Sequence, residues 1–219
     1  MIYGRTLEQL RAYFKQFPKI ALNTVKIVVI DMSPTYLNIA QTFFRNAIIV
    51  IDKFHVVKHL MEAVDAVRKR KQKNLKGCKD LIYQLRHAFC GRFDKLPAET
   101  RTKLNGLLAI DSDMKAAHEL KEEFLAIYAN ETLNRAETET TITAWIGKVN
   151  VAGVPELLDF VATYERRKEH ILNYFDYRYT NGLMEGLNNR NKVIQRMSYG
   201  FRTFAALRGK LLFELSGCG

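Results

Sequence analysis

The segment from Tyr179 to Arg196 combines residue types that could hold a metal ion beside a phosphate group. It reads YTNGLMEGLNNRNKVIQR. A helix that begins near Asn181, whose side chain can cap it, would place a carboxylate, amides and cations on one face: Glu185, Asn188 or Asn189, Lys192 and Arg196. Adjacent Asn residues are unusual at the centre of a solvated helix, because Asn is a poor helix former. This face therefore predicts a metal-binding carboxylate beside a surface that binds nucleic acid.

Two further carboxylates each follow a short apolar run. Asp31 comes after residues 25–30 and Asp52 after residues 47–51, and such β-branched runs are typical of strands buried in a sheet. If the two strands are parallel, both acids lie at the carboxyl edge of the sheet, where open α/β sheets usually hold their ligands. The alternative is that each Asp only caps the helix that follows it, and this alternative is stronger for Asp52.

Both acids belong to a predicted strand–helix–strand unit. Ser33 at the cap and Pro34 in the first turn begin a helix between the two runs. Such a unit predicts parallel strands with a right-handed crossover. Because Ser33 can cap that helix, Asp31 is not needed as the cap.

Helical patterns occupy most of the remaining chain. Thr6–Phe17 has apolar residues at intervals of three and four and ends at Pro18. The region from His55 to about Asn173 is predicted to be almost wholly helical, in segments 54–74, 80–93, 97–110, 111–128, 138–149 and 153–173. Gly200 is expected to break the helix of Glu185, before a last amphipathic helix over residues 201–215. No apolar run approaches the roughly 20 residues of a membrane span.

Charge indicates a polyanionic partner. The chain has 34 Lys and Arg against 23 Asp and Glu, and its basic excess lies on both sides of an acidic middle. Clustered cations favour a partner such as DNA over a role in solubility alone. The basic run from Arg68 through Lys69 and Arg70 to Lys73 could contact DNA phosphates or could be a solvated helix end.

The cysteines and histidines give weaker indications. Cys78, Cys90 and Cys218 are odd in number and widely spaced, which fits free thiols in a reducing cytoplasm better than disulfides. His55 and His59 have the spacing of a helical metal pair, but no third ligand accompanies them. A histidine that orients a catalytic carboxylate or contacts phosphate is an alternative, as is a packed core histidine.

Three blocks in order resemble one family. VVIDMSPTY, FFRNAIIVIDKFHVVKHL and TNGLMEGLNNRNKVIQRMSYGFRTFAALR are similar to the catalytic region of bacterial insertion-sequence DDE transposases, in the lineage named for the lactobacillus element ISL-three. The resemblance implies a mostly helical α/β fold: a partial RNase H-like core with two parallel strands and a large all-helical insertion. Its expected domains are residues 1–60 for the core, 61–175 for the insertion and 176–219 for the carboxyl-terminal catalytic and packing helices.

The resemblance also implies a site and a reaction. Asp31 and Glu185 match two of three carboxylates that hold two Mg²⁺ ions about 3.5–4 Å apart for cleavage and joining of DNA strands. Asp52 and His55 match a motif after the next strand, which could be catalytic or could support the catalytic residues. Asn188, Asn189, Lys192 and Arg196, with Arg68, Lys69 and Arg70, are the expected contacts to DNA.

One departure from the family pattern concerns the amino end. The opening three-stranded meander, which carries the first catalytic Asp, has no counterpart before Thr6, and residues 1–5 resemble only the tail of its third strand. The expectation is therefore an amino-terminally truncated transposase that is inactive alone. The alternative is a non-catalytic remnant that binds DNA or associates with intact transposase or with its own copies.

Overall fold

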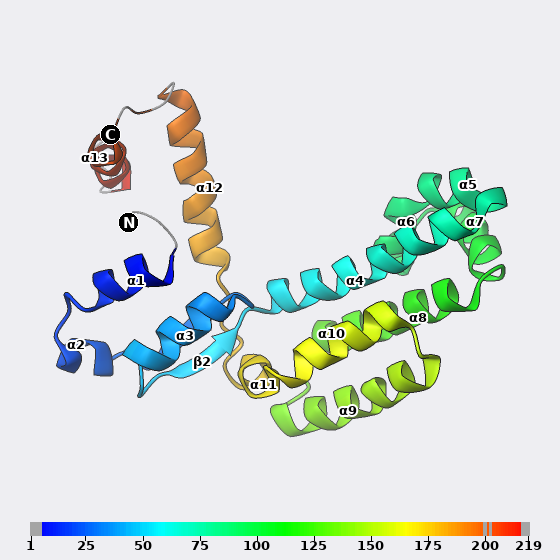
Figure 1. Cartoon of the computed structure of the whole chain (residues 1–219), viewed down its shortest axis with the longest axis horizontal. Coiled ribbons are helices and arrows are strands. Elements are labelled where there is room, and N and C mark those ends of the chain that lie inside the picture. Colours follow the sequence, from blue (N-terminus) through cyan, green and yellow to red (C-terminus); the bar gives the residue numbers. More distant parts are fainter. Residues whose placement is uncertain (1–5, 199–200, 202, 216–219) are drawn as a thin grey trace. The chain divides into compact units, whose positions relative to one another are not determined.

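The chain forms two compact units in a computed structural model that describes residues 6–198, 201 and 203–215 (Figure 1). The α/β unit comprises Met1–Asp52 and Tyr179–Gly219, and the helical unit comprises Lys53–Arg178. The side chains of Leu183, Glu185 and Leu215 lie outside the described parts, although their backbones are helical.

The α/β unit contains a two-stranded parallel sheet, as predicted. Strand β1 (Ile27–Ile30) pairs with β2 (Ile48–Ile51), with Ile27 opposite Ile48 and Ile30 opposite Ile51. Val50 and Ile51 are fully shielded from solvent, which explains why the run is apolar throughout. Helix α3 (Pro34–Phe43) connects the strands, so the expected strand–helix–strand unit is confirmed.

Two short helices precede the sheet. Helix α1 (Leu7–Phe14) begins with a capping box in which Thr6 and Gln9 each accept a backbone N–H of the other. Helix α2 (Lys19–Asn23) follows Pro18. Helix α1 packs on α3, where Arg11 donates a hydrogen bond to Asn38 at 3.0 Å. The amphipathic pattern of the opening segment therefore serves to cover α3.

The α/β unit ends with two helices, α12 (Gly182–Met197) and α13 (Phe204–Leu215). They pack on each other, with Ile194 and Leu211 buried and the Arg190 guanidinium bonded to the Glu214 carbonyl at 2.9 Å. The last helix begins three residues later than predicted. Gly200, expected to break α12, lies outside the described residues.

The helical unit is built around one long helix, α4 (Lys53–Asn74), against which α8 and α10 pack. The other elements are η1 (Lys76–Cys78), α5 (Lys79–Gln84), α6 (Arg86–Cys90), η2 (Phe93–Lys95), α7 (Ala98–Leu108), α8 (Ser112–Ala129), α9 (Arg135–Ala152), α10 (Pro155–Glu165) and α11 (Lys168–Tyr177). Among the described helices, none combines the length and the apolar character that crossing a bilayer requires.

Several helix boundaries differ from the predictions. The predicted helix 80–93 is two helices that meet at Leu85, and the predicted helix 153–173 is two helices separated at Arg167, because both residues leave the helical backbone region. Pro97 lies at the cap of α7 rather than in its first turn. Helix α9 begins before Thr138, because Asn134 and Glu137 form a capping box that the sequence analysis missed.

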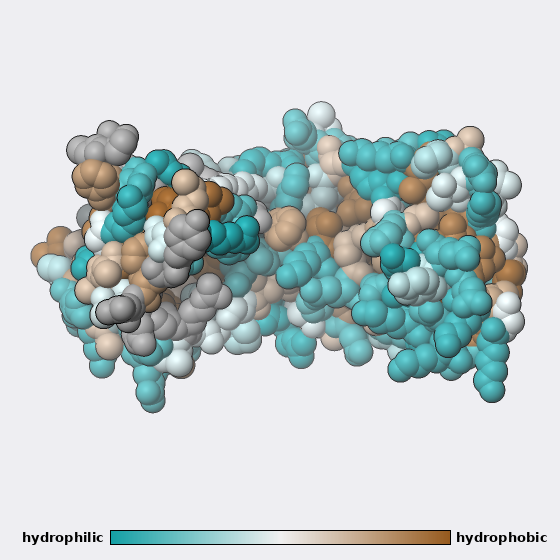
Figure 2. All heavy atoms as spheres, turned by 90° about the horizontal axis from the view of Figure 1, so that it is seen from above, coloured by the Kyte–Doolittle hydropathy of each residue, from teal (hydrophilic) through white to brown (hydrophobic). Residues whose placement is uncertain are grey.

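Aromatic side chains form the core of the helical unit. Phe124, Trp145 and Phe160 are buried, and their ring centroids lie 4.8–6.0 Å apart. The indole N–H of Trp145 donates to the Leu120 carbonyl at 2.8 Å, so its polar atom is satisfied. On the face seen in Figure 2, hydrophilic side chains cover much of this unit's surface.

Candidate functional site

Asp31 and Asp52 lie next to each other in register at the carboxyl edge of the sheet. Each follows the last residue of its strand, and those residues, Ile30 and Ile51, are direct partners. The backbone N–H of Asp52 also donates to the Ile30 carbonyl at 2.9 Å, so the strand pairing continues to the acid itself. The predicted gathering of two acids at one edge is thus present in the fold.

Asp31 shapes the turn that leads into α3. The backbone N–H of Ser33 donates to Asp31 Oδ1 at 2.8 Å. Ser33 is the cap residue of α3, but its side chain forms no capping hydrogen bond. The expectation that Ser33 makes an Asp31 cap unnecessary was therefore wrong, because one Asp31 oxygen supports this turn. The other oxygen receives no hydrogen bond within the described part of the chain.

Asp52 connects the sheet to the start of α12. Its side chain is 4% exposed, and its Oδ2 accepts the backbone N–H of Asn181 at 3.0 Å. Asn181 is the cap residue of α12, yet its side chain forms no capping bond, contrary to the prediction. Its backbone is instead bound by a carboxylate that lies 129 residues earlier in the chain. Asp52 thereby fixes the origin of α12 at the carboxyl edge.

This connection places the backbone of Glu185 close to the same edge. Glu185 comes four residues after Asn181 in α12, which is about one helical turn or 6 Å along the axis. Its side chain lies outside the described parts. Among the described residues, no group of three or more His, Cys, Asp or Glu could hold a metal ion.

The residues predicted to share a face with Glu185 are on the surface of α12. Asn188, Asn189, Lys192 and Arg196 are all exposed, and α12 is helical through all of them. Within the described residues, neither Lys192 nor Arg196 has a carboxylate partner. This α12 face presents cations and amides that can contact an anion.

The basic run at the end of α4 is different. Arg68 is buried, and its Nε donates to Asp65 at 2.6 Å. Arg70 makes two hydrogen bonds to Glu156, at 2.6 and 3.0 Å, and one to Asp113 at 3.1 Å. These bonds, first of all those to Glu156, raise the pKa of Arg70 above its ordinary value. Lys69 is exposed and pairs with Asp65.

These pairs bear on the two alternatives that the sequence left open for Arg68 and Arg70. Arg68 is paired within α4, whereas Arg70 joins α4 to acids of α8 and α10. A contact of either guanidinium with DNA stays a prediction. The acids that bind Arg70 lie 43 and 86 residues away in sequence, so the run itself gives no sign of them.

The histidines and cysteines of the helical unit show no metal site. His55 lies in the first turn of α4 beside the Phe54 ring, and His59 packs on Phe160 with a centroid distance of 5.6 Å. Cys78 and Cys90 are free thiols, as expected, whereas Cys218 lies outside the described residues. Burial raises the pKa of Cys90 to about 11, so its reactive thiolate form is disfavoured.

Sequence reasoning missed one feature of the α/β unit. Phe14 and Phe17 of the opening amphipathic segment line a cleft together with Phe43, and the rim of this cleft is cationic. The available signal was the lysines interleaved with these aromatics, at residues 15 and 19.

Comparisons with known proteins identify relatives over nearly the whole chain. Residues 1–211 match a family described as transposase, of the DDE ISL3 type. A transposase for insertion sequence element IS1001 from Bordetella parapertussis is 28% identical over 203 residues, which cover 91% of this chain and 50% of that protein. Transposases for insertion sequence element IS1557 from two strains of Mycobacterium tuberculosis are 22% identical, over 78% of this chain and 44% of theirs.

The matches cover most of this chain but a smaller share of each relative. The chain spans about half the length of the curated relatives it matches. No solved structure matches it.

Proposed function

Because the chain belongs to the ISL3-type family of insertion-sequence transposases, we propose that it forms the catalytic region of a DDE transposase. In this proposal the α/β unit is part of an RNase H-like core that cuts and joins DNA strands of an insertion sequence. The two parallel strands and the helix between them support this reading. The helical unit is then the insertion between the last strand and the helix that carries Glu185.

One observation carries the proposal: the hydrogen bond from Asn181 to Asp52. It brings the helix of Glu185 to the strand ends that carry Asp31 and Asp52, although the intervening chain forms a separate unit. Without such a connection, the two predicted metal ligands would have no reason to meet.

Asp31 and Glu185 are the residues that would hold Mg²⁺. Carboxylate oxygens suit this hard cation, and DDE transposases generally use a divalent metal. Bound Mg²⁺ would polarise the phosphate and stabilise charge on the attacking and leaving oxygens. Asp31 can offer Oδ2 while its Oδ1 keeps the Ser33 turn in place, so the protein holds this oxygen in advance of binding.

Asp52 has a positioning role in this proposal. Its buried carboxylate already accepts a backbone N–H, and it fixes where α12 begins. His55, which was considered together with Asp52, belongs to the helical unit, and a supporting role for it stays a prediction. Asn188, Asn189, Lys192 and Arg196 would contact DNA phosphates beside the metal site.

Binding of Mn²⁺ tests the metal site directly. Titration of the chain followed by electron paramagnetic resonance should show a site that weakens at least tenfold in Asp31→Asn and Glu185→Gln. Asn at position 31 can still accept the Ser33 N–H, so the turn should persist, which circular dichroism would check. Asp94→Asn, an exposed acid of the helical unit, is the matched control and should leave Mn²⁺ affinity unchanged. Equal affinity in Asp31→Asn would remove this residue from the site.

An assay of DNA binding and nicking distinguishes a transposase catalytic region from a non-catalytic protein that binds DNA. Asp31 and Glu185 are two of the three carboxylates that a DDE site needs, so we expect these 219 residues alone to bind element-end duplexes without Mg²⁺-dependent nicking. Robust nicking would contradict this expectation of inactivity. DNA binding without any Mn²⁺ site would instead favour the alternative of a non-catalytic protein that binds DNA or associates with intact transposase.

A further inference from the structure

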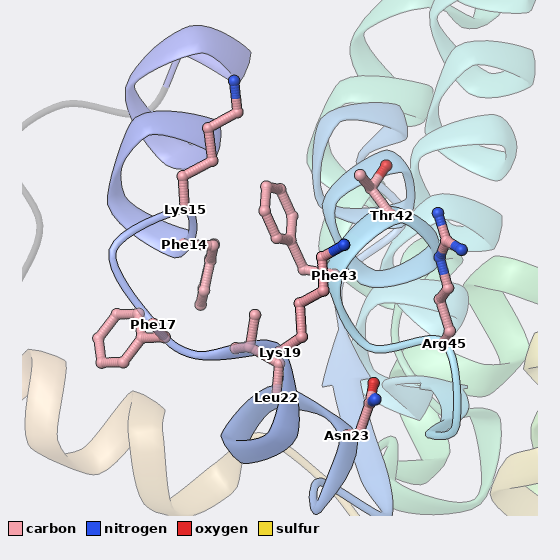
Figure 3. Close-up of a pocket in the computed structure, with 9 residues that line it drawn as sticks. All are labelled: Phe14, Lys15, Phe17, Lys19, Leu22, Asn23, Thr42, Phe43 and Arg45. Atoms are coloured by element: carbon pink, nitrogen blue, oxygen red, sulfur yellow. The ribbon is translucent and has the colours of Figure 1, made fainter.

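A cleft lies between α1 and α3, and its lining residues do not include Asp31 or Asp52 (Figure 3). It has a volume of about 420 Å³, which lies within the usual range for small-ligand sites. We define the aromatic–cationic cleft by six of its lining residues: Phe14, Phe17, Phe43, Lys15, Lys19 and Arg45.

The wall of the cleft is aromatic. The Phe14 and Phe43 rings point toward each other from α1 and α3 (Figure 3), with centroids 5.6 Å apart. Phe17 lies beside Phe14 at 6.5 Å and is 42% exposed. Because Phe14 and Phe43 already contact each other, a ligand would lie against this wall rather than between the rings. A flat, apolar group is what such a wall can stack upon.

The rim of the cleft is cationic. Lys15, Lys19 and Arg45 are exposed, and no Asp or Glu is among the lining residues. Within the described residues these three cations form no ion pair. The Lys19 side chain extends beside Phe43 (Figure 3). The occupant that complements this rim therefore carries negative charge as well as a flat apolar surface.

The cleft lies at the other end of the strands from the acids. Asn23 precedes β1 and Arg45 precedes β2, whereas Asp31 and Asp52 follow these strands. Four-residue strands separate the two ends by about 13 Å. A ligand in the cleft would therefore be a contact additional to the phosphate at the proposed metal site.

We propose that the aromatic–cationic cleft binds an unpaired nucleotide of single-stranded DNA, with the base on the phenylalanine wall and the phosphates on the cationic rim. The inference rests on the proposed DNA substrate. A duplex hides its base faces in the stack, whereas a single strand exposes them to aromatic side chains. Stacking is tolerant of sequence, because every base has an aromatic face. An acidic peptide is the competing occupant, and it would not need a flat wall.

Fluorescence anisotropy of a labelled oligodeoxythymidine tests the cleft. The full chain is titrated in EDTA, so that binding does not depend on a divalent ion. Phe17→Ala should weaken binding about fivefold or more, and Lys19→Ala should weaken it and lower its salt dependence. The matched controls are Tyr83→Ala and Lys79→Ala, exposed residues of the helical unit, which should bind like the parent chain.

A second variant tests the cleft even if Phe17→Ala does not fold. Phe17→Trp keeps the stacking surface and adds an exposed fluorophore, because Trp145 is buried. Its emission should change on addition of the oligodeoxythymidine and not on addition of polyglutamate. Unchanged affinity in Phe17→Ala, no change in Trp emission, or an equal change in Trp emission on addition of duplex or polyglutamate would each overturn the proposal.

The proposed metal site and the proposed nucleotide cleft can be tested independently. If Asp31→Asn keeps full Mn²⁺ affinity while Phe17→Ala loses DNA, the metal site is wrong and the cleft stands. If Phe17→Ala keeps DNA while Asp31→Asn loses Mn²⁺, the cleft is wrong and the metal site stands.

Discussion

Ion pairs are frequent in the helical unit and rare in the described part of the α/β unit. In the helical unit, Arg70 is bound by Glu156 and Asp113, and Lys71 by Asp111 and Asp113. Within the described part of the α/β unit, Lys210 and Glu214 form the one ion pair, whereas the cations of α12 and of the cleft face solvent. The helical unit therefore has paired as well as exposed cations such as Lys79, whereas most described cations of the α/β unit are exposed and have no carboxylate partner.

This difference shows why local charge is a poor guide to a binding surface. The densest basic run of the chain lies at the end of α4, and its arginines are held by acids of the same unit. The isolated cations of α12 form no conspicuous run, yet they are exposed. What decides the role of a cation is whether a carboxylate from elsewhere in the chain reaches it.

The largest effect should follow from replacing a buried cation of the helical unit. Lys121 is fully buried, and its Nζ donates to the carbonyls of Phe89 and Gly91 and pairs with Glu122. Lys121→Met leaves these acceptors without that donor, which should lower the free energy of unfolding by about 2–3 kcal/mol. Urea denaturation measures it. Lys148 forms an exposed pair with Glu123, so Lys148→Met should lower the free energy of unfolding by less than about 0.5 kcal/mol. Equal losses in the two variants would show that burial does not decide the contribution of these lysines.

An intermediate effect is expected at Arg70. Arg70→Ala should lower the free energy of unfolding by about 1–2 kcal/mol at neutral pH and leave DNA affinity unchanged. Arg70 holds the pKa of Glu156 below its ordinary value, and Lys71 followed by Arg70 does so for Asp113.

The same pair predicts a pH dependence. A lowered carboxyl pKa stabilises the folded chain above the ordinary pKa of about 4, and this contribution is lost as the pH falls through the lowered pKa. The difference between the parent chain and Arg70→Ala should therefore shrink between pH 5 and pH 3. Urea denaturation across this range is the measurement. A constant difference would count against the ion pair, and Arg92→Ala, whose pair with Asp94 is exposed, is the control.

The smallest effect on stability, but a clear effect on DNA, is expected at Lys192. Lys192→Ala should change the free energy of unfolding by less than about 0.5 kcal/mol while lowering the salt slope of DNA binding by about one. Lys69→Ala is the matched variant, because Lys69 is also exposed but is paired with Asp65. Lys69→Ala should change the slope less, and equal slopes would show that surface pairing does not decide DNA contact.

The sequence predicted features that depend on local pattern. The runs before Asp31 and Asp52 indicated two buried strands, and the helix between them fixed their parallel order, so the shared edge of the two acids followed from topology alone. The helix boundaries at Leu85 and Arg167 were missed because neither break contains Gly or Pro, the residues that usually signal one.

Features that depend on distant partners could not be predicted in the same way. The bond between Asp52 and Asn181 and that between Arg70 and Glu156 join residues 129 and 86 positions apart. Nothing in the neighbourhood of either residue specifies its partner. For the same reason the sequence left Asp52 between a catalytic and a supporting role, and the supporting role is the one proposed above from its burial and this bond.

The bond between Asp52 and Asn181 also has a consequence for the evolution of this protein. It joins Asp52, where the chain leaves the sheet, to Asn181, where the chain returns to it. The residues between them therefore form a closed loop. Closing a loop costs only slightly more as the loop grows. Residues could therefore be inserted into or deleted from this loop while the hydrogen bond between the strand end and the start of α12 is kept.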